Sequence, residues 1–535
     1  MNKRLKKNKA ASKGHKRAAN VDVGELIRTG YALQTQGRID ESLKCLEQVL
    51  RAEPGNPDAI HLTSLGLTNQ KKITDAVRFL RKWAAHPKSN NVATQYYIGY
   101  GYFLLKRYKL ALEHLEVALA FEPGKAITRL LIARVLIGSG KPDSAVEFLQ
   151  QGPAIVSRIP EDMMTYANVL TLLEQFEDAK KVLLKLLQSG SLTVQRLYDL
   201  ILLPPETWSR EHCEQVAEHL ADPDLSARDK EFLNYAAARI ADHRGQYQDA
   251  FRYFGNVKKL SSKAFDLGRL KRAVSTSVSD PARPATARST QNPVITPVFI
   301  LGLPRSGKTM LEKLLALNPE VAACGEITVR LFIDADIFID SGGNVPANYE
   351  ERLAGLKSTQ CSMYATDYIQ GVSEQYSLPE TTRYLINTLP SNYLNIRSLS
   401  RIFPQGKFIF VTRDKRDLFV FNYMKHFRNN FSFTRDFASF TQYHDLIEEQ
   451  IPNWQKQLGS NFLTVDYNDI VTSPVETLKQ VCNFLEVADT GGSVSTLKLA
   501  DIGFNDKHIG YWKNYQDLFP HTEADSGNDE RPAAQ

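Results

Sequence analysis

Residues 299–315, FILGLPRSGKTMLEKLL, decide the fold of the C-terminal half of the chain. An apolar run leads into a loop that contains Gly302 and Gly307, and a segment with the apolar spacing of a helix follows. The loop matches the G-x-x-x-x-G-K-[ST] pattern, which ends here in Lys308 and Thr309. Backbone amides at such a strand-to-helix turn hold phosphate well. The stretch therefore predicts anion binding, and it leaves open whether a nucleotide is hydrolysed.

The chain repeats this order of elements further along. KFIFVTRD, residues 407–414, and FLTVDYNDI, residues 462–470, are rich in β-branched and aromatic residues, and a helix-like segment follows each. Pro474 suits the first turn of the second of these helices. Strands that alternate with helices favour a parallel, doubly wound sheet covered on both faces. We therefore expect an α/β domain with a P-loop-like fold over residues 298–520.

Nucleotide hydrolysis requires more than the loop. A P-loop NTPase or kinase also needs an acid that holds magnesium, usually at the end of a second apolar strand. The acid at that place is Asp414, which lies among the cations Arg413, Lys415 and Arg416. Such a basic cluster suits a second phosphate better than a divalent cation. A kinase or NTPase is therefore the less favoured interpretation, and no metal is expected.

The first half of the chain has a different, repeated pattern. A small residue recurs at intervals of 34 or 35 residues, with an apolar residue four positions after each copy. The five copies are Ser42, Ala76, Ala111, Ala145 and Ala179. This period is typical of tetratricopeptide repeats, in which a small residue lets two helices approach closely. We therefore expect an α-solenoid over residues 22–271.

The repeat pattern weakens towards its end. GQYQDAFRYF, residues 245–254, restores the pattern with Ala250, which lies 71 residues after the fifth copy, close to two periods. Residues 191–235 are therefore expected to hold a divergent repeat, broken in part by Pro204 and Pro205. A solenoid of this kind usually offers a concave surface to a protein or peptide, and it can also brace a second domain.

Three segments have the composition of tails or linkers. Residues 1–21 form a basic tail that is poor in apolar residues, which we expect to be a disordered, solvated arm, with transient binding to nucleic acid or acidic lipid as the alternative. Residues 272–297 are rich in Ser, Thr, Ala and Pro and are interpreted as an exposed linker. Residues 521–535 are interpreted as a second disordered tail.

The overall composition narrows the class of protein. The 535 residues contain 66 Lys and Arg against 60 Asp and Glu, and much of the surplus lies in the basic tail, so nucleic acid is not an expected partner of the folded part. The five cysteines form no C-x-x-C pair, which argues against a zinc site or redox motif. No window approaches the roughly 20 apolar residues of a membrane helix, and no signal-peptide pattern opens the chain. We therefore expect a cytoplasmic protein.

Four stretches, taken in order, resemble the sulfotransferase family. They are FILGLPRSGKTMLEKLLALNPEVAACGE from residue 299, FPQGKFIFVTRDKRDLFVFNYMKHF from residue 403, VDYNDIVTSPVETLKQVCNFLEV from residue 465 and IGYWKNY from residue 509. With the repeats before them, the chain resembles bacterial proteins that join tetratricopeptide repeats to a sulfotransferase domain. The resemblance implies transfer of a sulfuryl group from the co-substrate 3′-phosphoadenosine 5′-phosphosulfate (PAPS) to a hydroxyl group.

The resemblance also implies roles for single residues. It places the 5′-phosphosulfate on the loop and the 3′-phosphate on Arg413, makes Glu326 the base that takes the acceptor's proton, and lets Trp512 and Lys513 close over the nucleotide. The loop residues concerned are Arg305, Ser306, Gly307, Lys308 and Thr309. Two of them, Arg305 and Lys308, carry the positive charge that can stabilise a developing negative charge on the bridging oxygen.

The chain departs from the family pattern at several places, and two of them concern the phosphate and charge-stabilising positions. Phe421 stands where the family has a second phosphate-binding serine, and its neighbour Asn422 is the candidate replacement. Asn387 and Thr388 stand where the family often has a lysine. Two interpretations therefore stay open. The favoured one is an active sulfotransferase with a hydroxyl acceptor. The repeats point to a protein or peptide as this acceptor, and a glycan or small alcohol is equally compatible with the catalytic half. The alternative is a weak or inactive scaffold whose repeats bind a partner.

Overall fold

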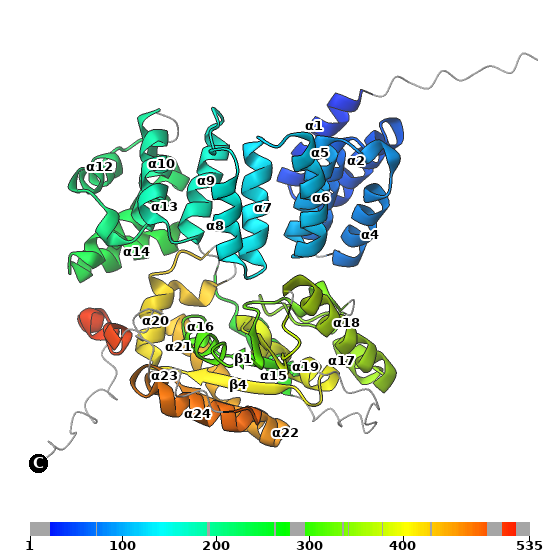
Figure 1. Cartoon of the computed structure of the whole chain (residues 1–535). Coiled ribbons are helices and arrows are strands. Elements are labelled where there is room, and N and C mark those ends of the chain that lie inside the picture. Colours follow the sequence, from blue (N-terminus) through cyan, green and yellow to red (C-terminus); the bar gives the residue numbers. More distant parts are fainter. Residues whose placement is uncertain are drawn as a thin grey trace, which may run out of the picture. The chain divides into compact units, whose positions relative to one another are not determined.

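The computed structural model describes most of the chain (Figure 1). The described residues are 22–70, 72–189, 193–261, 264–278, 295–333, 336–340, 342–376, 378–427, 431–488 and 506–519. Both predicted tails, residues 1–21 and 521–535, lie outside them. The chain forms two compact units, residues 1–128 and 129–535, and the sheet lies in the second.

Helices of the first unit pack in sequential pairs, α1 with α2, α3 with α4 and α5 with α6. The small residues Ser42, Ala76 and Ala111 are fully buried, as the repeat pattern predicts. A Cβ atom on Gly99 would lie 2.6 Å from Cγ of Leu115, so only a very small residue fits where α5 meets α6. The helices are α1 (Val23–Thr35), α2 (Ile39–Ala52), α3 (Pro57–Asn69), α4 (Ile73–Ala84), α5 (Val92–Leu104) and α6 (Tyr108–Phe121).

The second unit continues the helical repeats. Ala145, Ala179 and Ala250 are fully buried, and the 3₁₀ turn Pro205–Thr207 separates the two helices of the expected divergent repeat. The helices are α7 (Ala126–Gly138), α8 (Pro142–Gln151), α9 (Pro160–Leu172), α10 (Phe176–Gln188), α11 (Thr193–Leu202), α12 (Arg210–Leu220), α13 (Ala227–His243), α14 (Tyr247–Ser261) and α15 (Leu267–Val278). The predicted helical repeat region is confirmed. Within the described ranges, no helix is both long and apolar enough to span a membrane.

A five-stranded, all-parallel sheet follows the repeats in the second unit. Its strands are β1 (Thr296–Leu301), β2 (Val321–Ala323), β3 (Tyr384–Asn387), β4 (Lys407–Thr412) and β5 (Phe462–Asp466). The strand order is β2-β3-β1-β4-β5, so β1 is central, and Phe299 lies opposite Asn387 on one side and Phe408 on the other. The predicted parallel, doubly wound α/β fold is confirmed. The carboxyl end of β1 therefore opens between two neighbouring strands, which is where such sheets bind ligands.

Alternate residues of β1 face opposite sides of the sheet. Val298 and Ile300 pack against α16, α23 and α24, whereas Phe299 and Leu301 share a core with α18, α19 and α21. Helices therefore cover both faces (Figure 1). The helices of the domain are α16 (Lys308–Leu315), α17 (Tyr349–Ala354), α18 (Ser358–Tyr376), α19 (Ile396–Ile402), α20 (Lys415–Tyr423), α21 (Phe437–Glu448), α22 (Ile451–Leu458), α23 (Tyr467–Thr472) and α24 (Pro474–Leu485).

The structure differs from the predicted linker at its first residues. Helix α15 continues to Val278, and its residues Leu270, Ala273 and Val274 are buried in the same core as Phe299. The apolar spacing of three and four residues forms one helical face, which the Ser- and Thr-rich composition of the segment conceals. Helices α13 and α14 also contribute to this core. The predicted linker also extends too far at its other end, because β1 begins at Thr296. Residues 279–294, between these two elements, lie outside the described residues.

Lys258 of α14 joins the repeats to the α/β domain. Its ammonium group is buried and donates to the carbonyls of Asn422 and Lys425, at 3.3 and 2.9 Å, and to Oγ1 of Thr434 at 3.2 Å. The Asn422 carbonyl lies in the last turn of α20, where carbonyl groups have no partner within the helix. Lys258, which belongs to a repeat helix, therefore caps the C-terminus of α20 in the α/β domain.

We expect Lys258 to make the stability of this unit depend on pH. Burial lowers the pKa of Lys258 from 10.5 to about 7, so between these values the unfolded chain binds more protons than the folded chain. The free energy of unfolding then rises with pH across this window, by at most about 1.4 kcal/mol per pH unit. Denaturant unfolding followed by circular dichroism should show a smaller rise in Lys258→Met, whereas the exposed neighbour variant Lys259→Met keeps it. Equal slopes in all three proteins would contradict this role.

Candidate active site

The loop from Gly302 to Gly307 connects β1 to α16 through unusual backbone angles. Gly302 and Gly307 have φ angles of +138° and +100°. A Cβ atom on Gly302 would lie 2.6 Å from Oγ of Ser306, and one on Gly307 would lie 2.4 Å from the ring of Tyr467. Both positions therefore require glycine. Arg305 also has a positive φ, +70°, which costs energy for a residue with a side chain and is common at functional loops.

The loop has the features of an anion cradle. Gly307 is the N-cap of α16, so the first amides of this helix face the loop. The side chain of Ser306 is almost completely buried, and its Oγ has no hydrogen-bond partner within the described part of the chain. A buried polar atom without a partner costs free energy, which a bound ligand can recover. Ser306 and the helix terminus therefore fit an oxygen-rich anion such as a phosphate or sulfate.

Arg413, directly after β4, ties the loop to the C-terminal segment, residues 506–519. Its Nη1 donates to the carbonyl of Arg305 at 2.8 Å and its Nη2 donates to the carbonyl of His508 at 2.7 Å. The guanidinium carbon lies 3.9 Å from the ring centre of Tyr467 and 4.6 Å from that of Phe421. Burial lowers the pKa of Arg413 from its ordinary value. Arg413, the residue predicted to bind the 3′-phosphate, thus lies next to the loop. Its Nε is buried and has no hydrogen-bond partner among the described residues.

Phe421 and Asn422 take different positions on α20. The ring of Phe421 stacks on that of Tyr511, with 5.3 Å between centres. Asn422 is fully buried, and its Nδ2 donates to the carbonyls of Pro304 and Leu418, at 2.8 Å each. Asn422 therefore supports the loop from α20. Its proposed contact with the 3′-phosphate stays a prediction.

Lys308 points into the loop backbone. Its Nζ donates to the carbonyls of Gly302 and Leu303, at 3.0 and 2.8 Å. Burial lowers the pKa of Lys308 to about 8, and the charge of Glu326 acts in the opposite direction. The lysine therefore fixes the start of the loop. Its predicted role towards the bridging oxygen stays a prediction.

Glu326 is exposed and follows Gly325 just beyond β2. The amide of Gly325 donates to Oε1 of Glu312 at 2.7 Å, and its carbonyl accepts from the amide of Thr388 at 3.0 Å. Because Glu312 belongs to α16 and Thr388 follows β3, the segment before Glu326 is fixed from both sides. Glu326 therefore follows a segment that is held to α16, the helix that begins with Lys308.

The segment that lacks the family's lysine has a structural role here. Asn387 is fully buried, and its Nδ2 donates to the carbonyl of Ile327 at 2.8 Å and to the hydroxyl of Tyr368 at 3.0 Å. Its Oδ1 accepts from the amide of Leu389 at 3.0 Å. Asn387 therefore fixes the turn after β3 and the segment that carries Glu326.

Two carboxylates that the sequence does not predict as site residues hold the C-terminal segment, which contains η9 (Tyr511–Leu518). Asp417 accepts from the amides of Gly510 and Trp512, at 2.7 and 2.9 Å. Asp242 of α13 accepts from the hydroxyls of Tyr511 and Tyr515, at 2.8 and 2.5 Å. Asp417 lies in the first turn of α20. Because its partners are distant in the sequence, no local pattern indicates this contact.

The remaining predicted site residues lie at the edges of the loop and of this segment. The Arg416 guanidinium lies 3.6 Å from the ring centre of Trp512, which positions this ring beside α20. Thr309 and Lys513 are exposed. The structure therefore gathers the predicted loop residues, Arg413 and the C-terminal segment around the carboxyl end of β1.

Comparison with known protein families identifies both parts of the chain. The sulfotransferase family matches residues 297–491, and tetratricopeptide repeats match residues 26–56 and 102–157. The chain carries tetratricopeptide repeats followed by a sulfotransferase-family domain. The matched range of the sulfotransferase-family domain contains the loop, Glu326 and Arg413, and it ends before the C-terminal segment.

Similar proteins include both uncharacterised and named ones. An uncharacterised protein of Aquifex aeolicus is 20% identical over 418 residues, which are 72% of this chain and 53% of that protein. Protein-tyrosine sulfotransferase 2 of Gallus gallus is 27% identical over 195 residues, 36% of this chain and 51% of that protein. The chain therefore spans about half the length of these curated relatives. The solved sulfotransferase STF9 of Mycobacterium avium is 14% identical with a TM-score of 0.25, over 57% of this chain and 95% of its own.

Proposed function

We propose that the sulfotransferase-family domain transfers a sulfuryl group from PAPS to a hydroxyl group of an acceptor. The observation that carries this proposal is the buried hydroxyl of Ser306 at the N-terminus of α16, which has no hydrogen-bond partner among the described residues, with Arg413 beside the loop. This donor set fits a ligand with anionic groups at two points, as the 5′-phosphosulfate and 3′-phosphate of PAPS would supply. PAPS brings an activated sulfuryl group to the site.

Residues of the chain bind the phosphosulfate, stabilise the leaving group and accept the proton of the acceptor. Ser306, Gly307 and the first amides of α16 hold the phosphosulfate, with Thr309 at the open end of the loop. Arg305 is the exposed loop cation, and together with the buried charge of Lys308 it stabilises the charge that grows on the leaving group. Glu326 takes the proton from the acceptor hydroxyl.

Arg413 faces the 3′-phosphate, and Trp512 and Lys513 close the site from the C-terminal segment. Asn422, predicted at the same phosphate, acts through the loop instead, because its Nδ2 donates to the carbonyls of Pro304 and Leu418. The repeats suggest that the acceptor is a protein or peptide that they position. The cytoplasmic location and the absence of a metal requirement, both expected from the sequence, stay predictions.

One observation favours a second candidate, a scaffold without turnover. The Nζ group of Lys308 and both Nη groups of Arg413 donate to backbone carbonyls. These cations therefore support the backbone around the loop, which is a role that a scaffold also requires. A kinase or NTPase has less support, because the carboxylate of Asp414 accepts from the amides of Arg416 and Asp417 and thereby caps α20. That carboxylate is therefore already engaged as a helix cap, which argues against magnesium binding.

Transfer of radiolabelled sulfate from PAPS into a lysate of the native host tests these candidates. We expect transfer that persists with EDTA and falls by about tenfold or more in Arg305→Ala, since a charge-assisted hydrogen bond contributes roughly 1.5–3 kcal/mol. The exposed Arg210→Ala on α12 serves as the control. Magnesium-dependent phosphate release from ATP or GTP would contradict sulfuryl transfer. Tight binding of 3′,5′-adenosine bisphosphate without any transfer would favour the scaffold.

A further inference from the structure

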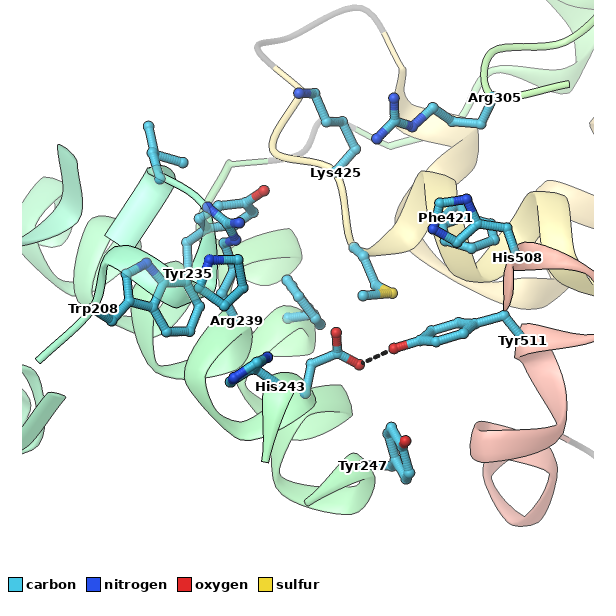
Figure 2. A pocket seen from close by; sticks show the side chains of 15 residues that line it. Trp208, Tyr235, Arg239, His243, Tyr247, Arg305, Phe421, Lys425, His508 and Tyr511 are labelled. Carbon is cyan, nitrogen blue, oxygen red and sulfur yellow. Dashed lines mark hydrogen bonds between the residues drawn. The ribbon is translucent and has the colours of Figure 1, made fainter. Parts of the chain in front are cut away.

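A cavity of about 620 Å³ lies between the last repeat helices and the loop, within the second unit (Figure 2). Its volume is within the usual range of small-molecule sites. The repeat side contributes Trp208, Tyr235 and Arg239, and the opposite side contributes Arg305, Phe421 and Lys425. The cavity therefore joins the repeats to the candidate active site by side chains that face the same space.

Three cations gather at this cavity. Desolvation of the ammonium group by the surrounding protein lowers the pKa of Lys425, and the charges of Arg305 and Arg239 lower it further. Among the described residues that line the cavity, the one carboxylate is that of Asp242, which accepts from the two tyrosine hydroxyls of the C-terminal segment. Positive groups that repel one another in a partly buried site favour binding of an anion.

The aromatic side chains in the lining indicate which kind of molecule carries this anionic group. The Arg239 guanidinium carbon lies 5.4 Å from the ring centre of Trp208, so this arginine is held over an aromatic face. Tyr235 and Phe421 add further ring surface to the lining. The Nη1 group of Arg239 donates to the carbonyl of Ile201, and the remaining N–H groups of the guanidinium can donate to an anion in the cavity. The cavity thus fits a small anionic group on an apolar or ring-containing body.

The position of the cavity indicates that it binds the sulfuryl acceptor rather than the donor PAPS. Arg305 lines it, whereas the other loop residues assigned to the phosphosulfate do not, and neither does Arg413. Glu326 follows Gly325, whose amide donates to Glu312 of α16, the helix that begins at the end of the same loop. A molecule whose anionic end lies in the cavity can extend past Arg305 towards this loop, where the proposed transfer takes place.

We propose that the cavity binds the anionic group of the sulfuryl acceptor and that Arg239, on a repeat helix, selects this group. The inference rests on the proposed sulfuryl transfer. It makes the repeats part of the acceptor site itself, and it defines the acceptor by a negative charge at some distance from its hydroxyl. A free acid and an acidic side chain of a peptide share this chemistry.

Calorimetric titration of the full chain, saturated with 3′,5′-adenosine bisphosphate, tests the charge preference without turnover. Three probes share one phenol and differ in the charge of their tail: 4-hydroxyphenylacetate, neutral tyrosol and cationic tyramine. We expect the acid to bind about tenfold tighter than tyrosol and tyramine to bind weakest. Arg239→Gln should remove this preference and leave the affinity for tyrosol within about twofold.

Arg228→Gln is the matched control for this variant. Arg228 is an exposed arginine of the same helix α13, and its guanidinium likewise lies over an aromatic ring, that of Phe232, at 5.3 Å. This variant should keep the preference for the acid. Blocked Asp-Tyr and Asn-Tyr dipeptides, titrated in the same way, separate a peptide source from a small acid. No binding of either acid-bearing probe, or an unchanged preference in Arg239→Gln, would overturn the proposal.

A turnover measurement separates this inference from the proposed function. With PAPS and a phenolic acid, Arg239→Gln should raise KM about tenfold and leave kcat within about twofold, because the residue binds the acceptor away from the reacting atoms. A fall in kcat at constant KM would contradict acceptor selection by Arg239. Failure of transfer with an intact charge preference would reject sulfuryl transfer and leave an anion site at the cavity.

Discussion

Glu326→Gln is expected to slow sulfuryl transfer by roughly 10²–10⁴-fold, the usual range for loss of a general base. The amide keeps the shape of the side chain but cannot take a proton. Nucleotide affinity should stay within about twofold, because Glu326 follows β2, on a segment fixed to Glu312 and Thr388 and separate from the loop amides. Single-turnover kinetics with labelled PAPS measure the rate, and calorimetry with 3′,5′-adenosine bisphosphate measures the affinity.

Glu320→Gln provides the matched control for this experiment. Glu320 precedes the same strand, β2, and its carboxylate pairs with Arg383 at 2.7 Å. Its loss removes one charge near the same strand without touching the segment after Gly325. We expect a rate close to that of the wild type. If Glu326→Gln also transferred at the wild-type rate, another group would have to act as the base.

The sequence predicts the repeats well because their signal is periodic. Each of the five small residues is fully buried, since each stands where two helices approach. The strand before the loop and the strand that ends at Thr412 are also predictable, because both are buried on two faces and contain almost only apolar residues. Strands β2 and β3 contain only three and four residues, too few for any pattern to distinguish them.

The candidate site is predictable in its composition and much less so in its contacts. The loop pattern identifies Ser306 and Lys308, but a pattern does not tell that one side chain lacks a partner while the other bonds to two loop carbonyls. Asp242 and Arg239 carry no signal at all, because their partners are distant in the sequence. The contacts of Asp242 depend on how α13 meets the α/β domain, and those of Arg239 depend on how α13 packs on the preceding repeat helices. A local pattern encodes neither.

The contact between Gly307 and Tyr467 connects the two phosphate positions of the proposed site. Tyr467 begins α23, directly after β5, and its ring supports the guanidinium of Arg413 at 3.9 Å. The same ring lies where a Cβ atom on residue 307 would have to be, at 2.4 Å. A side chain at residue 307 would therefore disturb the loop directly, and Arg413 through the displaced ring.

We therefore expect Gly307→Ala to weaken binding of 3′,5′-adenosine bisphosphate on the order of 100-fold, about 2.7 kcal/mol. The positive φ of Gly307 alone disfavours alanine by about 1–2 kcal/mol, and the contact with Tyr467 adds to this. Gly37→Ala controls for the backbone term, because Gly37 has a φ of +78° in a repeat turn and its Cβ would meet no atom within 4 Å. That variant should lose some stability in thermal unfolding and keep full affinity in calorimetry. Gly307→Ala combined with Tyr467→Ala should recover part of the affinity lost at the loop, since the collision is removed, but not the part that depends on Arg413. Wild-type affinity in Gly307→Ala would show that this loop is not the nucleotide site.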